Sequence, residues 1–484
     1  MIRIFASVSA LTLITLAVYC SRLLIESEAS PVAENKVSGV LKVGFAKRDI
    51  TPKVGPGEPP VYMAGFGQNR VATGIQDPLF ARAVVLDDGT SKLALVSVDI
   101  VGFFYPNALN VRGALPGYAH VVVSSTHNHE GPDTLGLWGP SPVKNGINPA
   151  YLKLVEQEVI QAVKEAEKSL AESQARFGVC KAPELLVDKR EPYLFHEDLY
   201  VLKFENTQGQ INGLLVNWHC HPETLADKNT KISADYVGYC CEALQKKYGC
   251  PVAYFTGTVG GLMTTLGLKV RDEQGTLLPA NSLEMTIEYG KQLAKVAERA
   301  VDASVPVSLT PLKIDRQEFY IPLANPLYKM GRTLGVLDRD AFRWNDNPLQ
   351  AGEKLPARNS TGNICMVTET SLITLGDVQI ACIPGEIYPE LVFGKVQDPV
   401  DPGADFPQAP VEPSIYGSMQ ARHKMLFGLA NDELGYIIPK RQWDSKPPFC
   451  YGRKKDQYGE ENSCGPEMAP IICDMFRQLS ADKK

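Results

Sequence analysis

Residues 121–132 read VVVSSTHNHEGP, and this stretch decides which fold class and which kind of site we expect. Its three valines predict a buried β-strand, and Gly131-Pro132 predicts the loop that follows. On an extended backbone, side chains two positions apart point the same way, so the rings of His127 and His129 are expected to face one pocket. A rigid strand end that opens into a loop is a good place to hold a metal ion or a catalytic imidazole.

A second histidine pair strengthens the metal interpretation. An isolated H-x-H pattern is short, and its alternative interpretation is a pair of ordinary polar loop residues. The chain has seven histidines, yet His219 and His221 repeat the spacing directly after a predicted strand. Two such pairs in so histidine-poor a sequence favour a metal site.

Strand and helix patterns alternate along the chain, which predicts an α/β fold with a mixed β-sheet core and flanking helices. Strands are expected at residues 43–50, 80–86, 92–98, 121–125, 175–180, 199–204, 211–218, 252–255, 312–321, 372–375 and 378–383, and helices at 150–173, 235–248, 283–303 and 470–480. Sites in α/β folds collect at strand ends. His127, His221 and Glu386 each follow a predicted strand, so we expect a zinc site there.

Composition and the N-terminus limit the function classes. The chain has 484 residues and a net charge of −6 without a basic run, so nucleic acid is not an expected partner. Arg3 precedes an apolar run at residues 4–19, which fits a signal-peptide core and is short for a membrane-spanning helix. Lipidation of Cys20 is disfavoured by the bulky Tyr19. We expect export, with residues 1–38 as a signal peptide or N-terminal anchor plus tether.

Eleven cysteines are present, and ten remain when Cys20 is set aside. Disulfides are compatible with export, and Cys450 and Cys464 are a candidate local pair because they flank a Gly-rich, charged loop. Connectivity does not follow from sequence. Cys382, inside an apolar strand, is expected to be a buried thiol.

Neutral imidazoles with a carboxylate are the donors that suit zinc, and a hydrolytic zinc needs three protein ligands and an open position. Two other interpretations are rejected. A metallo-β-lactamase would need an Asp-His pair after His129 at the required spacing. A phosphate loop at residues 257–261 would need a following Gly-Lys-Ser/Thr, so these glycines are expected to form a tight turn near the metal.

A set of motifs, in order, resembles the neutral/alkaline non-lysosomal ceramidases from about Val43 to about Pro466. The motifs are Asp49-Ile50-Thr51-Pro52; Asp77-Pro78-Leu79 with Arg82; residues 125–132; Cys220-His221-Pro222; Ser233-Ala234-Asp235-Tyr236; Pro384-Gly385-Glu386; and residues 431–436 followed by Tyr458-Gly459-Glu460. Each motif is weak alone, and together they are specific for the family. The resemblance implies that residues 39–484 form a catalytic domain in which the family's C-terminal β-sandwich is absent or reduced.

The resemblance also implies a set of site residues and a reaction. It implies one zinc ion per chain, held by His127, His221, Glu386 and Tyr436. His129 matches a histidine that contacts the reacting group, and Arg190 and Tyr458 match pocket residues that donate hydrogen bonds to a developing oxyanion or leaving amine. The implied reaction is hydrolysis of the ceramide amide to a fatty acid and sphingosine.

Three positions depart from the family pattern. Thr264 falls where the family carries a catalytic serine, and it keeps the hydroxyl but adds a methyl group. Leu262 stands where an acid is expected, and Glu433 stands where a tyrosine is common. The extra imidazole of His219 is interpreted as lying behind the ligands or at the surface.

We therefore expect a secreted or periplasmic zinc amidohydrolase of ceramide or another lipid-like N-acyl compound, with association at a membrane surface. One alternative keeps the zinc and changes the substrate to a soluble amide or ester. Another is a non-catalytic surface binding protein on the same scaffold, which Leu262 and Thr264 would allow. The hydrolase interpretation requires that His127, His221, Glu386 and Tyr436 converge on one point with room for a water molecule.

Overall fold

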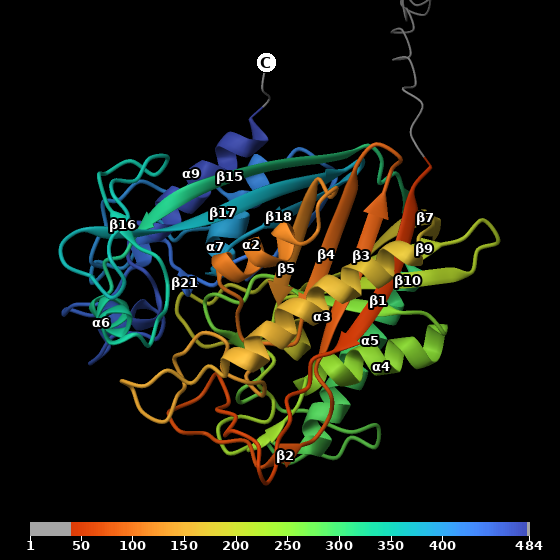
Figure 1. The fold of residues 1–484 in the computed structure, drawn as a ribbon, viewed down its shortest axis with the longest axis horizontal. Helices are drawn as coiled ribbons and strands as arrows, with labels where there is room; N and C mark the ends of the chain where they lie inside the picture. The colour runs from red at the N-terminus through yellow and green to blue at the C-terminus, as the bar shows by residue number, and fades with distance from the viewer. Residues whose placement is uncertain (1–39, 482–484) are drawn as a thin grey trace, which may run out of the picture. The chain divides into compact units, whose positions relative to one another are not determined.

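The computed structural model describes residues 40–481, which contain three five-stranded sheets. The first sheet has the order β5-β4-β3-β1-β6 and comprises β1 (Lys42–Asp49), β3 (Phe80–Asp87), β4 (Lys92–Val98), β5 (His120–Ser125) and β6 (Ala171–Glu172). β4 and β5 are parallel and are connected through helix α2 (Tyr105–Gly113). Helix α3 (Pro149–Lys168) lies across one face (Figure 1) and buries its valines there, because they recur at helical spacing.

The second sheet has the order β12-β10-β9-β7-β14. It comprises β7 (Gln174–Lys181), β9 (Asp198–Glu205), β10 (Ile211–Trp218), β12 (Val252–Thr256) and β14 (Val305–Val307). β10 and β12 are parallel. Helices α4 (Asp235–Tyr248) and α5 (Leu283–Asp302) bury their apolar faces in the same core as this sheet.

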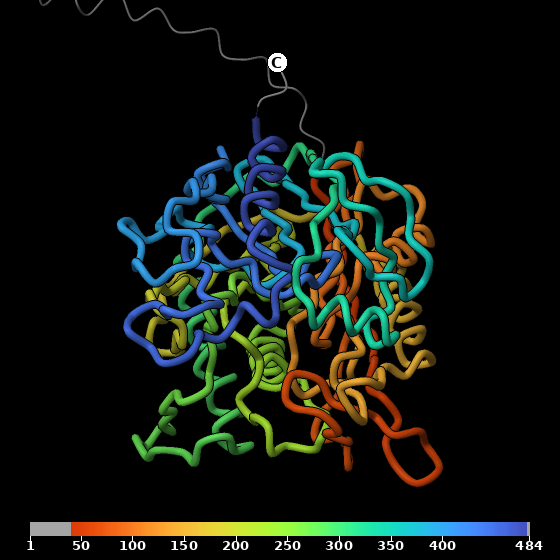
Figure 2. Tube along the Cα trace, turned by 90° about the vertical axis from the view of Figure 1, so that its left-hand side faces the viewer, coloured from red at the N-terminus to blue at the C-terminus, as the bar shows by residue number. Residues whose placement is uncertain are grey.

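The third sheet is formed by the C-terminal part of the chain. It comprises β15 (Leu312–Pro322), β16 (Phe342–Arg343), β17 (Ile364–Leu375), β18 (Val378–Cys382) and β20 (His423–Phe427), with β18 and β20 parallel. Helix α9 (Met468–Ser480) packs on β15 and β17. After a 90° turn, the cyan and blue segments of this part occupy the upper region of the view (Figure 2).

Short elements complete the described chain. They are the strands β2 (Gly74–Ile75), β8 (Val187–Asp188), β11 (Lys231–Ile232), β13 (Met263–Thr264), β19 (Glu386–Ile387) and β21 (Tyr436–Ile437), the helices α6 (Pro326–Leu334), α7 (Pro389–Phe393) and α8 (Ile415–Ser418), and 3-10 helices at Pro183–Leu185, Lys440–Gln442, Cys450–Gly452 and Glu460–Asn462.

Side chains from all three sheets share one apolar core. Leu95 of β4, Leu215 of β10 and Ile380 of β18 are fully buried in it. The rings of Phe255 and Phe427 stack there at 4.2 Å between centroids. Burial of this shared core removes apolar surface from water and fixes the three sheets against one another.

Hydrogen bonds join the sheets where their parallel strands end. The Asn431 amide donates to the Val123 carbonyl at 2.7 Å, and the Val123 amide donates to Oδ1 of Asn431 at 2.7 Å. Nδ2 of Asn431 donates to Glu369 of β17 at 2.9 Å. The Gly428 amide donates to the Thr256 carbonyl at 3.0 Å. The carboxyl ends of β5, β12 and β20 therefore meet at one place.

The predicted fold class is confirmed, and most predicted elements are present within a few residues. The helix expected at 150–173 ends at Lys168, because Ser169 closes it and residues 171–172 pair with β1. The strand expected at 372–375 begins at Ile364. Its first half carries polar residues beside apolar ones, and pairing with β15 along its whole length makes it a strand.

The candidate pairing of Cys450 with Cys464 was wrong. All ten cysteines of the described chain are free thiols. Cys464 donates toward the Leu434 carbonyl at 3.3 Å, whereas the backbone of Cys450 is bound to Asp444, so the two residues belong to different contacts. Cys382 is a buried free thiol, as predicted.

The predicted signal peptide or anchor lies outside the described residues. Within residues 40–481, no helix has both the length and the apolar character that crossing a membrane requires.

We expect Arg82→Met to lower the free energy of unfolding by about 3–5 kcal/mol, because it leaves the Asp99 carboxylate buried without its charge partner. The two side chains are buried and lie 2.6 Å apart. Urea denaturation measures the loss. Arg48→Met, on the neighbouring strand, is the matched control, because Arg48 pairs with Glu158 in a solvent-accessible position and its loss should change stability little. Equal losses in the two variants would contradict a special role for the buried pair.

Candidate metal centre

His127 lies two residues after β5 in a left-handed backbone conformation, with φ at +65°. The expectation that both histidines lie on one extended segment was therefore wrong, because the strand ends at Ser125. The rings converge through a turn instead, with the centroids of His127 and His129 4.9 Å apart. A non-glycine residue in this conformation costs about 1–3 kcal/mol, and such strain is typical of functional sites.

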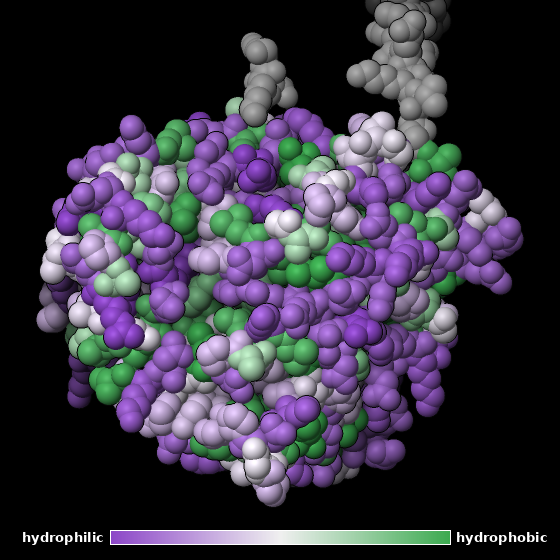
Figure 3. All heavy atoms as spheres, viewed as in Figure 1, coloured by the Kyte–Doolittle hydropathy of each residue, from purple (hydrophilic) through white to green (hydrophobic). Residues whose placement is uncertain are grey.

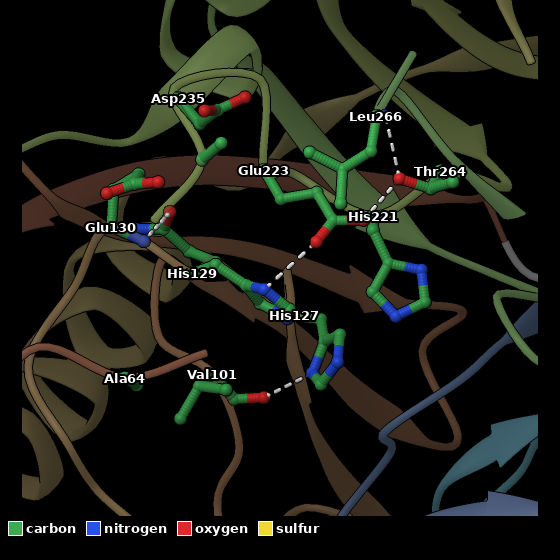
Figure 4. Close-up of polar contacts among 12 residues, drawn as sticks. Ala64, Val101, His127, His129, Glu130, His221, Glu223, Asp235, Thr264 and Leu266 are labelled. Atoms are coloured by element: carbon green, nitrogen blue, oxygen red, sulfur yellow. Dashed lines mark hydrogen bonds and ion pairs between the residues drawn. The ribbon is translucent and has the colours of Figure 1, made fainter. Parts of the chain in front are cut away.

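The two predicted histidine ligands have their tautomers fixed by backbone carbonyls. Nδ1 of His127 donates to the Val101 carbonyl at 2.7 Å (Figure 4), and Nδ1 of His221 donates to the Met263 carbonyl at 2.7 Å. Each ring therefore turns Nε2 toward the other donor atoms of the site. Metal-binding histidines are commonly oriented in this way.

Glu386 and Tyr436 complete this group of four. They lie opposite each other in the parallel pairing of β19 with β21. Oε2 of Glu386 lies 3.0 Å from Nε2 of His221 and 3.4 Å from Nε2 of His127. The Tyr436 hydroxyl lies 3.3 Å from Nε2 of His221. Four residues distant in sequence therefore bring their donor atoms to a common point.

The donor set has the electrostatics of a cation site. Burial by itself lowers the pKa of His127, but the Glu386 carboxylate outweighs it and raises the pKa to about 9. Burial by itself raises the pKa of Glu386. The charges and hydrogen bonds of His127 and His221 outweigh burial, so the pKa lies below its ordinary value. The free donor atoms of His127, His129 and His221 lie within 4.8 Å of one another. A single divalent ion fits the chemistry of these donors.

His129 lies beside the two predicted histidine ligands and also contacts a second carboxylate. Nδ1 of His129 lies 3.2 Å from Oε2 of Glu223. The Thr264 hydroxyl donates to the other oxygen of Glu223 and accepts from the Leu266 amide at 2.8 Å (Figure 4). Burial lowers the pKa of His129 to about 4, so its ring is neutral at pH 7. Glu223 was not singled out from sequence, although it follows His221 by two residues.

Gly65 lets the ring of His129 occupy its position. A Cβ atom at Gly65 would overlap the ring, and the φ of +93° also disfavours other residues. Phe66 packs edge-on against His129, with centroids 5.1 Å apart. The loop at residues 63–67 thus forms part of the site.

Arg190 is engaged inside the protein. Its terminal nitrogens donate to Glu460 at 2.6 and 2.8 Å, and to the carbonyls of Tyr458 and Gln442 at 2.8 and 3.0 Å. It therefore holds the segment that carries Tyr458. The Tyr458 ring is 47% exposed and lies 5.6 Å from the Tyr436 ring, between centroids.

Leu262 and Glu433, which depart from the family pattern, lie in different environments. Leu262 packs against the apolar core of the third sheet, and the nearby acid is Asp188, whose pKa burial raises to about 7. Glu433 is buried, accepts from the Gly435 amide through Oε1 at 2.8 Å, and has no partner for Oε2 among the described residues. Burial and the neighbouring Glu386 raise the pKa of Glu433 well above its usual range.

His219 is neither at the surface nor bonded to the four donors. It is fully buried and stacks on His196 at 3.4 Å between centroids. Its Nδ1 accepts from the Thr258 amide at 2.9 Å. This histidine therefore holds the loop after β12, and the partner His196 carried no motif that would have identified it from sequence.

A cavity of about 280 Å³ opens from the donor atoms. Its polar end carries His127, His129, Glu386, Tyr436 and Glu433. Its remaining walls are mostly apolar and include Phe104, Leu135, Leu137, Trp138, Leu323, Leu337, Met366 and Leu434. The cavity therefore suits a ligand with a polar reacting group and an apolar chain.

The fold and the site define a mixed α/β protein with a candidate centre for one metal ion at its strand ends. Residues 41–253 match the family described as neutral/alkaline non-lysosomal ceramidase, N-terminal. The resemblance expected from the motifs is therefore confirmed.

Curated relatives show the same likeness. The neutral ceramidase of Pseudomonas aeruginosa is 24% identical over 294 residues, which are 55% of this chain and 43% of that protein. The neutral ceramidase of Drosophila melanogaster is 25% identical over 236 residues, which are 44% of this chain and 33% of that protein. The chain thus spans less than half the length of these relatives.

Two solved structures share the fold. The crystal structure of the Pseudomonas aeruginosa neutral ceramidase superposes with a TM-score of 0.66 at 17% identity, covering 91% of this chain and 74% of that one. A structure described as ceramidase complexed with C2 gives 0.64 at 16% identity with the same coverage.

The raised pKa of His127 predicts how pH affects metal-free protein. The His127 imidazole contributes fully to the free energy of unfolding below pH 6.5, its pKa in the unfolded chain. That contribution is lost as pH rises through about 9, its pKa in the folded protein. We expect the unfolding free energy of chelator-treated protein to fall by on the order of 3 kcal/mol across this window, measured by urea denaturation. The fall should be absent in His127→Gln. A stability that rises across the window would contradict the assignment.

Proposed function

We propose that this chain is a zinc-dependent amidohydrolase that cleaves ceramide, or a related lipid-like N-acyl compound, into a fatty acid and an amine. The convergence of His127, His221, Glu386 and Tyr436 at one end of an apolar cavity carries this proposal. The likeness to neutral ceramidases supports the reaction and the substrate class.

One zinc ion per chain would be held by these four residues. The two histidines offer Nε2 because their Nδ1 atoms donate to carbonyls, and the Glu386 carboxylate supplies negative charge. Zinc in such a centre polarises a carbonyl oxygen and makes a water molecule acidic near neutral pH.

His129 handles the proton in this proposal. Its neutral ring holds Nδ1 toward Glu223, which leaves Nε2 to accept a proton from the water molecule that adds to the amide carbonyl. Nε2 then gives that proton to the nitrogen as the carbon–nitrogen bond breaks and the amine leaves. The Glu223 carboxylate then stabilises the imidazolium, as a carboxylate does in other acid–base pairs. The hydroxyl of Thr264 fixes Glu223, so we assign Thr264 a positioning role.

Tyr458 lines the cavity, and Arg190 supports it from inside the protein. Tyr458 is 47% exposed and lines the cavity, and its hydroxyl is proposed to donate a hydrogen bond to the reacting group. Arg190 positions it through the Tyr458 carbonyl, because its terminal nitrogens are bonded within the protein.

Glu433 favours a particular kind of substrate. Glu433 lines the polar end of the cavity, and its buried Oε2 has no hydrogen-bond partner among the described residues. A carboxyl group there suits an N-acyl compound whose amine part carries a hydrogen-bond donor beside the amide. Ceramide has such hydroxyls, and a more soluble amide with a polar amine part is the second candidate.

The proposal also covers the domain organisation of the chain and where the protein acts. We propose that residues 39–484 form the catalytic domain, that residues 1–38 are a signal peptide or anchor with a tether, and that the protein acts outside the cytoplasm at a lipid surface.

We expect purified protein to release fatty acid from short-chain ceramide, and chelation to abolish the release. His129→Gln should lower kcat by about 10²–10⁴-fold without loss of bound zinc, because it removes proton transfer. His127→Ala should lose the zinc itself. His423→Ala is the control, since His423 lies on β20 away from the cavity. Full activity in metal-free protein would reject the mechanism.

We expect Thr264→Val to lower kcat about 10–100-fold, the range found when a residue supporting a site is lost. Thr264→Ser should stay within a few-fold of wild type, because the serine hydroxyl still donates to Glu223. Steady-state kinetics and the pH profile of kcat measure the effect. If Thr264→Ser were as inactive as Thr264→Val, the hydroxyl contact would not be the cause.

A further inference from the structure

Helix α6 contributes one face to the cavity and another to solvent. Tyr328 and Arg332 of this helix line the cavity. On the outer face, Leu327, Met330 and Leu334 are 53, 51 and 42% exposed. Their spacing of three and four residues places them on one side of the helix.

This outer face reverses the usual arrangement of an amphipathic helix, which buries its apolar stripe. Single exposed apolar residues are common on soluble proteins, but a row of three on one helix face marks a surface that contacts something apolar. Green spheres lie among purple and white ones toward the lower left of the molecule in Figure 3, near the position of α6 in Figure 1.

Basic side chains flank this face. Lys329 reaches the Gly362 carbonyl at 3.2 Å, and the guanidinium of Arg358 packs beside Gly335 at the end of the helix. Neither cation forms an ion pair with another described residue. Of the nearby acids, Asp340 pairs with Lys354 and Asp338 is exposed. Cations beside an apolar face fit the headgroup layer of an anionic membrane.

We propose that the outer face of α6 is a docking surface for a lipid bilayer, which places the cavity against the membrane. The proposal rests on the proposed function, because a lipid-like substrate would then reach the cavity from the bilayer without crossing water. Three side chains form too small a face for a stable protein interface, which buries about 1,200–2,000 Å² in total. A short apolar face with flanking cations is what insertion into a membrane interface requires.

The test uses the full chain and vesicles of phosphatidylcholine with phosphatidylserine. The variant is Leu327→Ser with Met330→Ser and Leu334→Ser, none of which lines the cavity. The matched control replaces Leu109, Val179 and Val305 with serine, since these are exposed to a similar degree elsewhere. Hydrogen–deuterium exchange of residues 326–337, with and without vesicles, reports contact at α6 itself.

We expect vesicles to slow exchange of residues 326–337 in the wild type and the control variant, and not in the α6 variant. Hydrolysis of vesicle-embedded ceramide should fall at least about tenfold in the α6 variant, because three apolar side chains no longer insert. The rate at which the α6 variant hydrolyses a dissolved short-chain substrate, without micelles, should stay within twofold of the wild-type rate. A double variant, Lys329→Glu with Arg358→Glu, should weaken protection on anionic vesicles only.

Three results would overturn the docking surface: unchanged exchange at residues 326–337 in the wild type, equal and measurable vesicle activity in the α6 and control variants, or a wild-type dimer that the α6 variant makes monomeric in light scattering. The last result would identify a second copy as the occupant. If vesicles protect α6 but no amide substrate is cleaved, the proposed function fails and the docking surface stands.

Discussion

The contact between Val123 and Asn431 is the constraint on which the site depends. Asn431 completes the hydrogen bonding of the last strand of the first sheet, and its amide group also binds Glu369 in the third sheet. Through this one residue the segment before His127 and the segment before Tyr436 are held in register. The donor atoms can meet only because these strand ends are fixed relative to each other before the loops begin, as a preorganised site requires.

The pKa values of two histidines in the same loop are shifted in opposite directions by their surroundings. His127 faces Glu386, which raises its pKa to about 9, and burial lowers that of His129 to about 4 although Glu223 is near. Residues whose surroundings push their pKa values apart are suited to different tasks. The ring that attracts positive charge is suited to holding a cation, and the neutral ring is suited to moving protons.

The sequence predicted the fold class and most elements because strand and helix patterns are local properties of the chain. It also indicated which residues could be ligands, since imidazoles and a carboxylate followed predicted strands. It could not predict the left-handed turn at His127, because that conformation depends on packing around the strand end. The roles of Glu223 and Asn431 were hidden for the same reason: Val123 and Asn431 are 308 positions apart in sequence. The pairing of two cysteines was inferred from proximity along the chain, which does not imply proximity of sulfur atoms.

Gly65 and Gly67, in the loop at residues 63–67, differ in how well each position tolerates a larger residue. Gly65 touches the His129 ring, so any larger residue would displace the imidazole that faces Glu223. Gly67 also borders the cavity, but a Cβ atom there meets nothing within 4 Å, and its φ of +47° is one that asparagine adopts readily. The size of the cavity entrance can therefore be varied at one position while its neighbour, two residues away, is closed to change.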